Sequence, residues 1–419
     1  MCGKWCVMQK KWLFVFTIIL IGAILCVGCT QQVAQGEKTG VAKGDASTPE
    51  YKTVIDSRGV AVKVPADIKR VVTISDGLVE GTMIRFGVQD TLVGVGSSCI
   101  QRNFSYDFPS VKGKNVTYVR GMNPVLYLYP KIGTLPRIGE SSVAINYETL
   151  AGLKPDVVIL RLGDCTLRYP DDENVKKTIS TIESLNIPLV VTYGPNAYKT
   201  ATVSGITDEI RILGEVFGKE TEAKKMSDYL EGQVNMIKQR TREIPDAQKP
   251  SVLVLGLSPT ARSQGGAGQV FGRGTIESFF IEDLVNAKNS YNEEAATFKT
   301  LSAEQILANN PDRIVLCTAN GYHPPMELYE APYYQNLQEL SAVKNRQVSA
   351  LPWTPCNCGK RLEYPIDVMV IAKTAYPDKF ADVELSEWLL QFYENLYGVN
   401  ETTAKDLRSV QWMDWTVKS

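Results

Sequence analysis

One pattern occurs twice in this chain, and it constrains the fold more than any other feature. The first copy runs from Glu148 to Leu160 and the second from Glu304 to Leu316. In each copy a glutamate opens a short helical stretch, a Pro-Asp pair ends it, and a run rich in β-branched residues follows. Proline ends a helix because it lacks an N–H and disfavours helical backbone in the residue before it. The pattern therefore predicts a short helix, a sharp turn and a buried strand in each copy.

The repeat predicts two similar lobes rather than one growing sheet. Strand-like runs alternate with helical stretches in both halves, which favours a parallel sheet in each lobe. Between the repeats, residues 220–242 lack proline and carry Met226, Leu230, Val234 and Ile237 at helical spacing. At 1.5 Å per residue such a helix would be about 34 Å long. We therefore predict an α/β fold with two Rossmann-like lobes, joined by one long backbone helix, and a ligand cleft between the lobes.

With this paired motif and long helix, the chain resembles the iron-siderophore, haem and cobalamin-binding family of ABC-transporter substrate-binding proteins. The resemblance covers roughly residues 54–380. In that family the paired glutamates contact arginines of the membrane permease, so the resemblance implies a docking role for Glu148 and Glu304. The alternative for each glutamate is that it only complements the dipole of the helix it begins.

The resemblance also implies what the protein does and what it works with. The partners would be an ABC permease and its ATPase, and the ligand would be an iron-siderophore, haem or a corrinoid, which contains iron or cobalt. The protein would act by binding, without catalysis and without an intrinsic cofactor.

Residues 1–29 have the features of a lipoprotein signal peptide. Lysines at the start precede an uncharged run from Trp12 to Gly28, and a small residue stands before Cys29. This resembles a lipoprotein cleavage box, with Cys29 as the lipid-bearing residue, although Cys26 stands where the box usually has leucine. The alternative is an uncleaved anchor helix. In both cases we expect a protein anchored at the extracytoplasmic face of the cell membrane.

The remaining boundaries follow from composition and pattern. Residues 30–50 have few large apolar side chains and predict a flexible tether. The expected parts after the tether are an N-terminal lobe (51–205), linking helices (206–245), a C-terminal lobe (246–384) and a closing helix with a tail (385–419). The net charge is −1 with no basic stripe, so we expect no nucleic-acid partner. We also expect a monomer.

The candidate ligand contacts lie where predicted strands end, because ligands bind beyond the carboxyl ends of parallel strands. In the first lobe these are Ser75, Asp76, Ser98, Arg161 and Tyr193. In the second lobe Tyr322 and His323 follow a predicted strand, and the resemblance adds Arg262, Gln269, Trp353 and Arg361. The alternative for each residue is an ordinary position in a loop. Residues 101–139, rich in tyrosine and proline, predict either part of the cleft rim or a surface insertion.

Cysteines and one histidine give a second hypothesis. Cys356 and Cys358 are one residue apart, and Cys99 and Cys165 follow predicted strands of the other lobe. Four thiolates in one cleft would suit a soft metal or a cluster, and so a redox protein or an enzyme. His323, the single histidine, cannot build a multi-histidine zinc site. Its imidazole would suit iron in haem or cobalt in a corrinoid, and the alternative is a rim histidine that makes a hydrogen bond.

Overall fold

A parallel sheet with the strand order β4-β3-β7-β8 forms the first lobe of the computed structural model. The structure describes residues 50–139, 145–294, 298–318, 322–355 and 359–417. The four strands of this sheet are β3 (Val71–Ile74), β4 (Leu92–Val95), β7 (Val157–Leu162) and β8 (Leu189–Tyr193). The helices of the lobe are α1 (Leu78–Phe86), α3 (Tyr147–Gly152), α4 (Glu173–Ser184) and α5 (Ser204–Phe217). An antiparallel hairpin of β1 (Tyr51–Ile55) and β2 (Ala61–Pro65) precedes the sheet.

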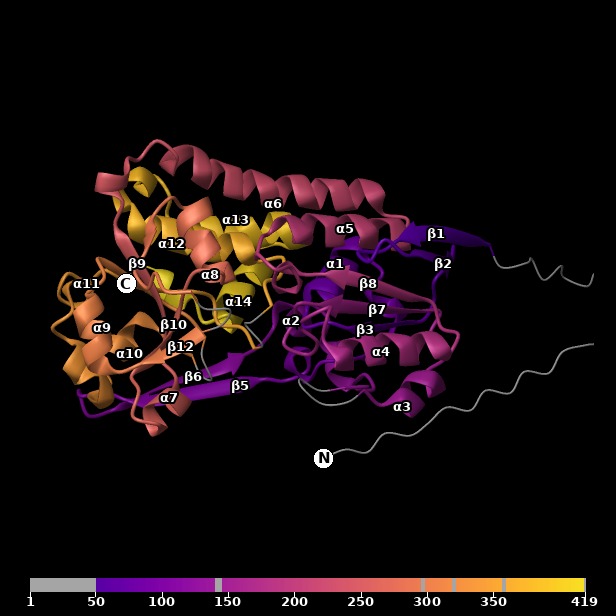
Figure 1. Ribbon diagram of the computed structural model, residues 1–419, viewed down its shortest axis with the longest axis horizontal. Coiled ribbons are helices and arrows are strands. Elements are labelled where there is room, and N and C mark those ends of the chain that lie inside the picture. The colour runs from indigo at the N-terminus through magenta and orange to yellow at the C-terminus, as the bar shows by residue number, and fades with distance from the viewer. Residues whose placement is uncertain (1–49, 140–144, 295–297, 319–321, 356–358, 418–419) are drawn as a thin grey trace, which may run out of the picture. The chain divides into compact units, whose positions relative to one another are not determined.

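A hairpin arm leaves the first lobe between β4 and α3. It consists of β5 (Phe104–Pro109) and β6 (Asn115–Gly121), which pair antiparallel, and α2 (Pro124–Leu128) follows it. We call residues 104–121 the arm. In Figure 1 its two strands run along the lower side of the molecule, from the first lobe to the second.

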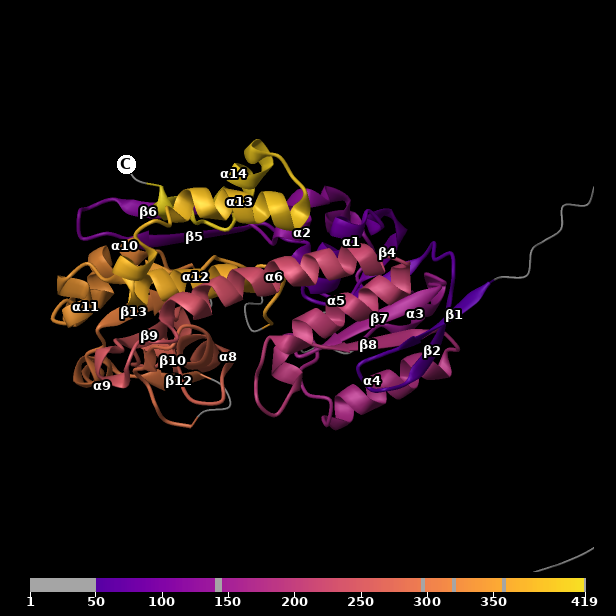
Figure 2. The same ribbon diagram turned by 90° about the horizontal axis from the view of Figure 1, so that it is seen from above.

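The long backbone helix is present as α6 (Glu220–Thr241), whose 22 residues span about 33 Å. Gly218, with a φ of 64°, ends α5 in the left-handed conformation that glycine adopts without strain. Figure 2 shows α6 running from the first lobe, beside α5, into the second lobe, beside α12. The predicted helix and its position between the repeats are confirmed.

The second lobe holds a sheet with the order β12-β10-β9-β13-β14, and β11 pairs with β9 as well. Its strands are β9 (Ser251–Gly256), β10 (Gly268–Phe271), β11 (Lys288–Asn289), β12 (Phe298–Leu301), β13 (Arg313–Leu316) and β14 (Val348–Ala350). The helices are α7 (Pro259–Ser263), α8 (Ile276–Phe279), α9 (Ala303–Asn309), α10 (Pro325–Glu330), α11 (Ser341–Lys344) and α12 (Tyr364–Ala375). β10 runs antiparallel to β9 and β12 antiparallel to β10. This sheet is therefore mixed rather than parallel throughout, because the connection from β9 to β10, which holds only the short helix α7, is too short for the crossover that parallel strands need.

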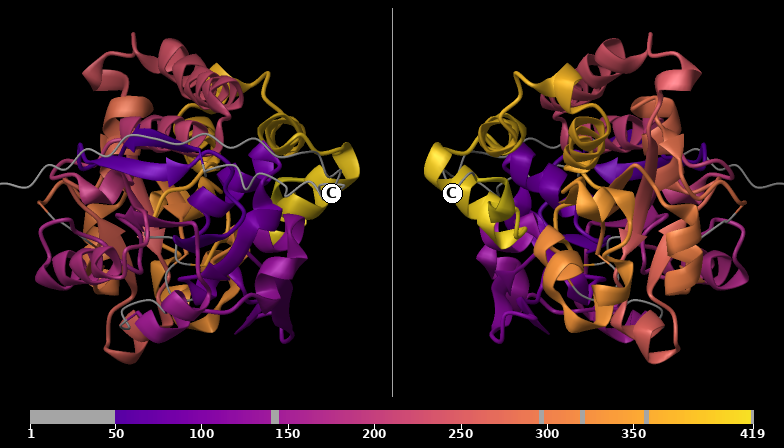
Figure 3. Two further views of the ribbon diagram at one scale, coloured as in Figure 1. Left: turned by 90° about the vertical axis from the view of Figure 1, so that its right-hand side faces the viewer. Right: turned by 90° about the vertical axis from the view of Figure 1, so that its left-hand side faces the viewer.

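The chain ends in α13 (Leu385–Tyr397) and α14 (Glu401–Val410). The tail expected after residue 397 thus contains a second helix. Figure 3 shows these two helices, in yellow, gathered on one flank of the molecule.

A single buried apolar cluster contains residues of both lobes and of the helices between them. It includes Val71 of β3, Leu230 of α6, Val252 of β9, Ile371 of α12 and Leu389 of α13. The lobes are therefore joined by packed side chains on the α6 side and not by the helix alone.

The predicted signal peptide, most of the tether and Cys29 lie outside the described residues. Among the residues that the structure does describe, no helix is long and apolar enough to cross a membrane.

Candidate functional site

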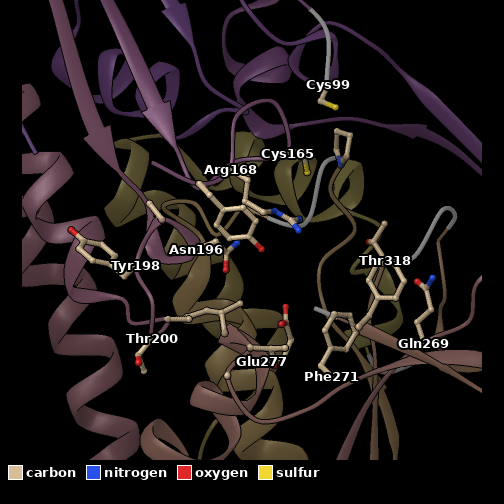
Figure 4. Close-up of a pocket in the computed structure, with 18 of the residues that line it drawn as sticks. Cys99, Cys165, Arg168, Asn196, Tyr198, Thr200, Gln269, Phe271, Glu277 and Thr318 are labelled. Atoms are coloured by element: carbon tan, nitrogen blue, oxygen red, sulfur yellow. The ribbon is translucent and has the colours of Figure 1, made fainter. Parts of the chain in front are cut away.

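A cavity of about 1600 Å³ is lined by both lobes and by the arm. The segments that follow β7, β8, β13 and β14 all reach it, so it lies beyond the carboxyl ends of these parallel strands, as expected for such sheets. Figure 4 shows Arg168, Asn196 and Tyr198 of the first lobe on one side and Gln269, Phe271 and Glu277 of the second lobe across from them. The cavity is larger than the roughly 300–1,000 Å³ that most small-molecule sites occupy.

Aromatic side chains from four separate segments form a continuous wall of the cavity. Phe104 comes from the arm, Tyr322 and Trp353 from the second lobe, and Trp412 from the tail. The ring centroids lie 4.5 Å apart for Trp353 and Trp412, 4.9 Å for Tyr322 and Trp412, and 5.2 Å for Phe104 and Trp353. These spacings suit tilted aromatic pairs, which stabilise one another beyond their burial. The wall is therefore largely apolar, and its rings pack on one another.

Aromatic residues also stand at the cavity's outer edge. Tyr169 and Tyr198 of the first lobe are 44% and 37% exposed, and Phe298 of the second lobe is 48% exposed. Exposed aromatic side chains gathered around one hollow mark a binding site, since a ligand would cover them.

Three cationic side chains line the cavity: Arg168, Lys199 and Arg273. None of them forms an ion pair with a carboxylate in the part of the chain that the structure describes. Two exposed carboxylates, Asp171 and Glu294, line it as well. The charged groups are thus free to meet charged groups of a ligand.

A third carboxylate, Glu277, belongs to a buried ion-pair network behind the cavity. The ammonium group of Lys360 lies 3.2 Å from Glu277 and 2.9 Å from Asp367. Burial alone would lower the pKa of Lys360, but the two carboxylates raise it overall, so the lysine stays charged. The network fixes Glu277 at the wall.

Three of the sequence-predicted contacts line the cavity: Gln269, Tyr322 and Trp353. Their exposed fractions are 8%, 1% and 4%, so they lie in its inner wall rather than at its outer edge. Their role as ligand contacts stays a prediction. The other eight predicted residues do not line the cavity, and their side chains contact other groups of the protein.

Ser75, Asp76 and Ser98 hold the loops at the strand ends. The Ser75 hydroxyl accepts hydrogen bonds from the backbone N–H groups of Gly77 and Val79, where α1 begins. The Asp76 carboxylate accepts from the Cys165 N–H at 2.8 Å. Ser98 is buried in the turn after β4. These side chains therefore support the cavity loops from behind.

Arg161 is fully buried and joins the two lobes. Its guanidinium donates to both Glu209 carboxylate oxygens at 2.7 and 2.9 Å, to the backbone oxygen of Lys360 at 2.8 Å, and to Asp164. Burial raises the pKa of Asp164 to about 7, although Arg161 opposes this shift. Since all of these partners are protein groups, the arginine is a structural link.

Arg262 and His323 belong to a polar cluster within the second lobe. The Arg262 guanidinium lies over the ring of Tyr333, 4.0 Å from its centroid, and donates to Tyr334. His323 is 1% exposed, and its Nδ1 lies 2.9 Å from a carboxylate oxygen of Glu327. Neither side chain lines the cavity, and metal ligation by His323 stays a prediction.

The last two predicted contacts lie close to the cavity without lining it. Tyr193 is half-buried, and its ring packs edge-on to the lining residue Tyr198 with centroids 6.1 Å apart. Arg361 is buried, and it donates to the Thr354 hydroxyl and the backbone oxygen of Pro355. It therefore holds the loop that carries Trp353.

Two of the four cysteines of the second hypothesis lie among the described residues. Cys99 and Cys165 both line the cavity, and both are disulfide-bonded. A disulfide sulfur is not a thiolate ligand, so these two do not offer thiolates in this state. Cys356 and Cys358 lie outside the described residues. Among the residues that are described, no group of three or more His, Cys, Asp or Glu side chains is placed to hold a metal ion.

Several lining residues were not predicted from the sequence. Arg168, Tyr198 and Lys199 stand a few residues beyond the strand ends that we singled out, in the same loops. Trp412 reaches the cavity because α14 turns the tail back toward the arm, and no local pattern signals this.

Glu148 and Glu304 occupy equivalent places in the two lobes. Both are exposed, and each lies in the first turn of its helix, α3 or α9. Figure 1 shows these helices in different lobes, both on the side away from α6. Hydrogen bonds to the Ser302 hydroxyl and to backbone N–H lower the pKa of Glu304, so its charge is secured.

Two lobes, a long connecting helix and a cavity at the strand ends define a two-lobed solute-binding protein. The chain belongs to the periplasmic binding protein family, whose model matches residues 83–354. It is a solute-binding protein of an ABC transporter, and the family is extracytoplasmic. The family resemblance noted in the sequence is confirmed.

Known proteins similar to this chain differ in their ligands. This chain is 24% identical over 308 residues to the molybdate-binding protein MolA of Haemophilus influenzae. The aligned region covers 68% of this chain and 76% of that relative. A crystal structure of a periplasmic solute-binding protein from Veillonella parvula matches with a TM-score of 0.64 at 21% identity, covering 88% of this chain and all of that one. The nickel–histidine complex of Helicobacter pylori CeuE matches with a TM-score of 0.58 at 15% identity, over 85% of this chain and 99% of that one. These likenesses support the fold and leave the ligand open.

Proposed function

We propose that this protein captures an organic metal complex, such as an iron-siderophore, haem or a corrinoid, and delivers it to an ABC permease. The observation that supports this most is the cavity of about 1600 Å³ with an aromatic wall and three unpaired cations. Aromatic faces suit a large organic ligand, and arginine and lysine suit its carboxylate, phosphate or phenolate groups.

The relative that binds molybdate offers a second candidate ligand. A tetrahedral oxyanion is small and needs donors that converge at hydrogen-bond distance. The cations here lie around a large cavity with aromatic side chains among them, which favours the organic complex. Molybdate is therefore the comparison ligand in the test below.

Transport would follow binding without chemistry by the protein. The exposed carboxylates of Glu148 and Glu304 suit arginines of a permease, one on each lobe. Cys29 would carry the lipid that keeps the receptor at the extracytoplasmic face of the membrane, and residues 30–50 would be the tether. No catalytic step, intrinsic cofactor or nucleic acid belongs to this proposal, and the chain would act as a monomer.

Tryptophan fluorescence tests the proposed ligand class. The chain without residues 1–29 would be titrated with haem, cobalamin, a panel of ferric siderophores and molybdate. We expect one organic complex to quench the fluorescence at 1:1 stoichiometry, because Trp353 and Trp412 line the cavity. The variant Trp353→Phe should lose much of the quenching.

The matched control is Trp388→Phe, since Trp388 stacks on Phe392 of α13 with centroids 5.3 Å apart and does not line the cavity. This variant should keep the wild-type quenching. Saturable binding of molybdate with no response to any organic complex would contradict the proposal. A stoichiometric iron–sulfur absorption spectrum in protein purified anaerobically without added ligand would support the redox hypothesis instead.

A further inference from the structure

The arm is anchored in the first lobe at its base. The side-chain amide of Gln101 donates to the backbone oxygens of Ile132 and Leu135, each at 2.9 Å. Also at the base, just after the returning strand, the Asn123 side-chain amide donates to the backbone oxygen of Asp76 at 3.1 Å. Both strands of the hairpin therefore start from fixed positions on the first lobe.

The outgoing strand of the arm is buried in the second lobe. Phe108 is 0% exposed and belongs to the same apolar cluster as Leu253 of β9, Ile314 of β13 and Leu328 of α10. Burial of a phenylalanine side chain is a strong anchor, because it removes a large apolar area from water.

Polar contacts fix the outgoing strand and the tip to α10. The Tyr106 hydroxyl donates to Glu327 at 2.7 Å, the Val111 N–H to the backbone oxygen of Glu330 at 2.8 Å, and the Ser110 hydroxyl to the Glu330 carboxylate at 2.8 Å. The Lys112 ammonium lies 2.5 Å from the same carboxylate. The tip is thus held by two side chains and by the backbone.

The returning strand is held by the tail. The Trp412 indole N–H donates to the backbone oxygen of Val119 at 2.8 Å, and the Met122 N–H donates to Val410 at 3.2 Å. The ring of Tyr118 lies 4.9 Å from that of Tyr322, edge-on. Since Trp412 and Tyr322 also line the cavity, this strand backs the aromatic wall.

The lobes are therefore connected on two sides. Figure 1 shows α6 along the upper side of the molecule and the arm along the lower side, and each spans both lobes. Phe104, Ser105 and Tyr106 of the arm line the cavity.

We propose that the arm is a second brace between the lobes, which fixes the width of the cavity before ligand binds. Without it, the lobes could rock about the α6 side, where the shared core joins them. With it, the receptor takes its ligand into a preformed cavity, and the arm sets how large that ligand can be. The limit on ligand size rests on the proposed function, whereas the brace itself does not.

Distance measurement in the ligand-free protein tests the brace. Spin labels would be attached through unnatural amino acids introduced at Lys177 of α4 and at Ala308 of α9, both exposed, so that the disulfide-bonded Cys99 and Cys165 are left undisturbed. Pulsed electron resonance then gives the distribution of distances between the lobes. We expect a single narrow distribution in the parent protein, and a wider distribution in Phe108→Ala, which loses the buried anchor.

A milder variant removes only the contacts at the tip. Ser110→Ala combined with Lys112→Ala takes both side chains away from Glu330 and leaves the apolar core whole, so folding is secure. We expect it to widen the distribution less than Phe108→Ala does. The matched control is Lys224→Ala, which removes an exposed ion pair within α6 and should leave the distribution unchanged.

The outcomes separate the brace from the receptor function. A broad distribution in the parent protein would overturn the brace, as would unchanged narrow distributions in both arm variants. If Phe108→Ala fails to fold, the double variant decides alone. No ligand takes part, so failure here would leave the proposed function standing, and failure of the ligand titration would leave the brace standing.

Discussion

Glu80 on α1 should make the stability of the protein fall as the pH rises. Its side chain is completely buried, and this burial raises the pKa of the carboxyl from 4.5 to about 7. This net pKa includes smaller contributions: the hydroxyls of Thr73 and Ser75 lower the pKa, and the nearby Asp164 raises it. An unfolded chain would release this proton near pH 4.5, whereas the folded protein holds it to about pH 7.

The sign follows from which state binds the proton. Between about pH 4.5 and pH 7 the folded state binds more protons than the unfolded state, so stability is lost as the pH rises through this window. One pKa unit corresponds to about 1.4 kcal/mol, and the shift therefore costs about 3 kcal/mol above pH 7. Between pH 5 and pH 8 the loss that Glu80 contributes is about 2.5 kcal/mol.

The variant Glu80→Gln keeps the volume and removes the charge. We expect its free energy of unfolding to rise relative to that of the parent protein by about 2.5 kcal/mol between pH 5 and pH 8. Urea unfolding followed by circular dichroism at both pH values measures this difference. Asp164, whose pKa burial also raises, is present in both proteins, so its own contribution largely cancels in the comparison.

The control is Glu222→Gln on the exposed face of α6. Its free energy of unfolding should differ from that of the parent protein by the same amount at pH 5 and pH 8. If the difference in free energy of unfolding between Glu80→Gln and the parent protein is the same at pH 5 and pH 8, burial does not raise the pKa of Glu80 as described.

Three further outcomes follow from the site. Arg161→Met should lower the free energy of unfolding by about 3–5 kcal/mol in a urea titration, because it leaves buried carboxylates unpaired, and a loss below 1 kcal/mol would speak against the structural link. Glu148→Lys and Glu304→Lys should keep the ligand affinity of the parent but abolish uptake in transport assays with the permease, and a collapse of affinity would contradict the docking role. Cys165→Ser should lower the unfolding free energy by about 2–4 kcal/mol, as should reduction of the parent protein, and equal stability of oxidised and reduced protein would count against a structural disulfide.

The lobes and the connecting helix could be predicted because their signals are local. Pro155 and Pro311 end their helices in the sequence itself, and the stripe from Met226 to Ile237 repeats every three or four residues. The antiparallel direction of β10 could not be predicted, because the sequence does not show which neighbouring strand a short strand will pair with.

The sequence predicted where the cavity lies but only some of the residues that line it. The strand-end rule placed it correctly, yet it selected Ser75, Asp76 and Arg161, which the structure uses to hold the loops. A polar residue directly after a buried strand has its neighbours' backbone groups within reach, so it is recruited to satisfy them. Residues further along each loop, such as Arg168, are free to face the cavity.

Contacts between distant segments could not be predicted at all. Trp412 of the tail packs on Trp353 of the second lobe, with ring centroids 4.5 Å apart. That the same ring also lines the cavity depends on how α14 folds back, and this is decided by tertiary packing rather than by sequence spacing.

Native mass spectrometry of the chain without residues 1–29 tests the central claim most directly. The protein would be mixed with haem, cobalamin, ferric siderophores and molybdate at equal concentrations. We predict one added mass per chain, equal to that of one organic metal complex. An added mass equal to molybdate, or no added mass from any of the organic complexes, would contradict the account.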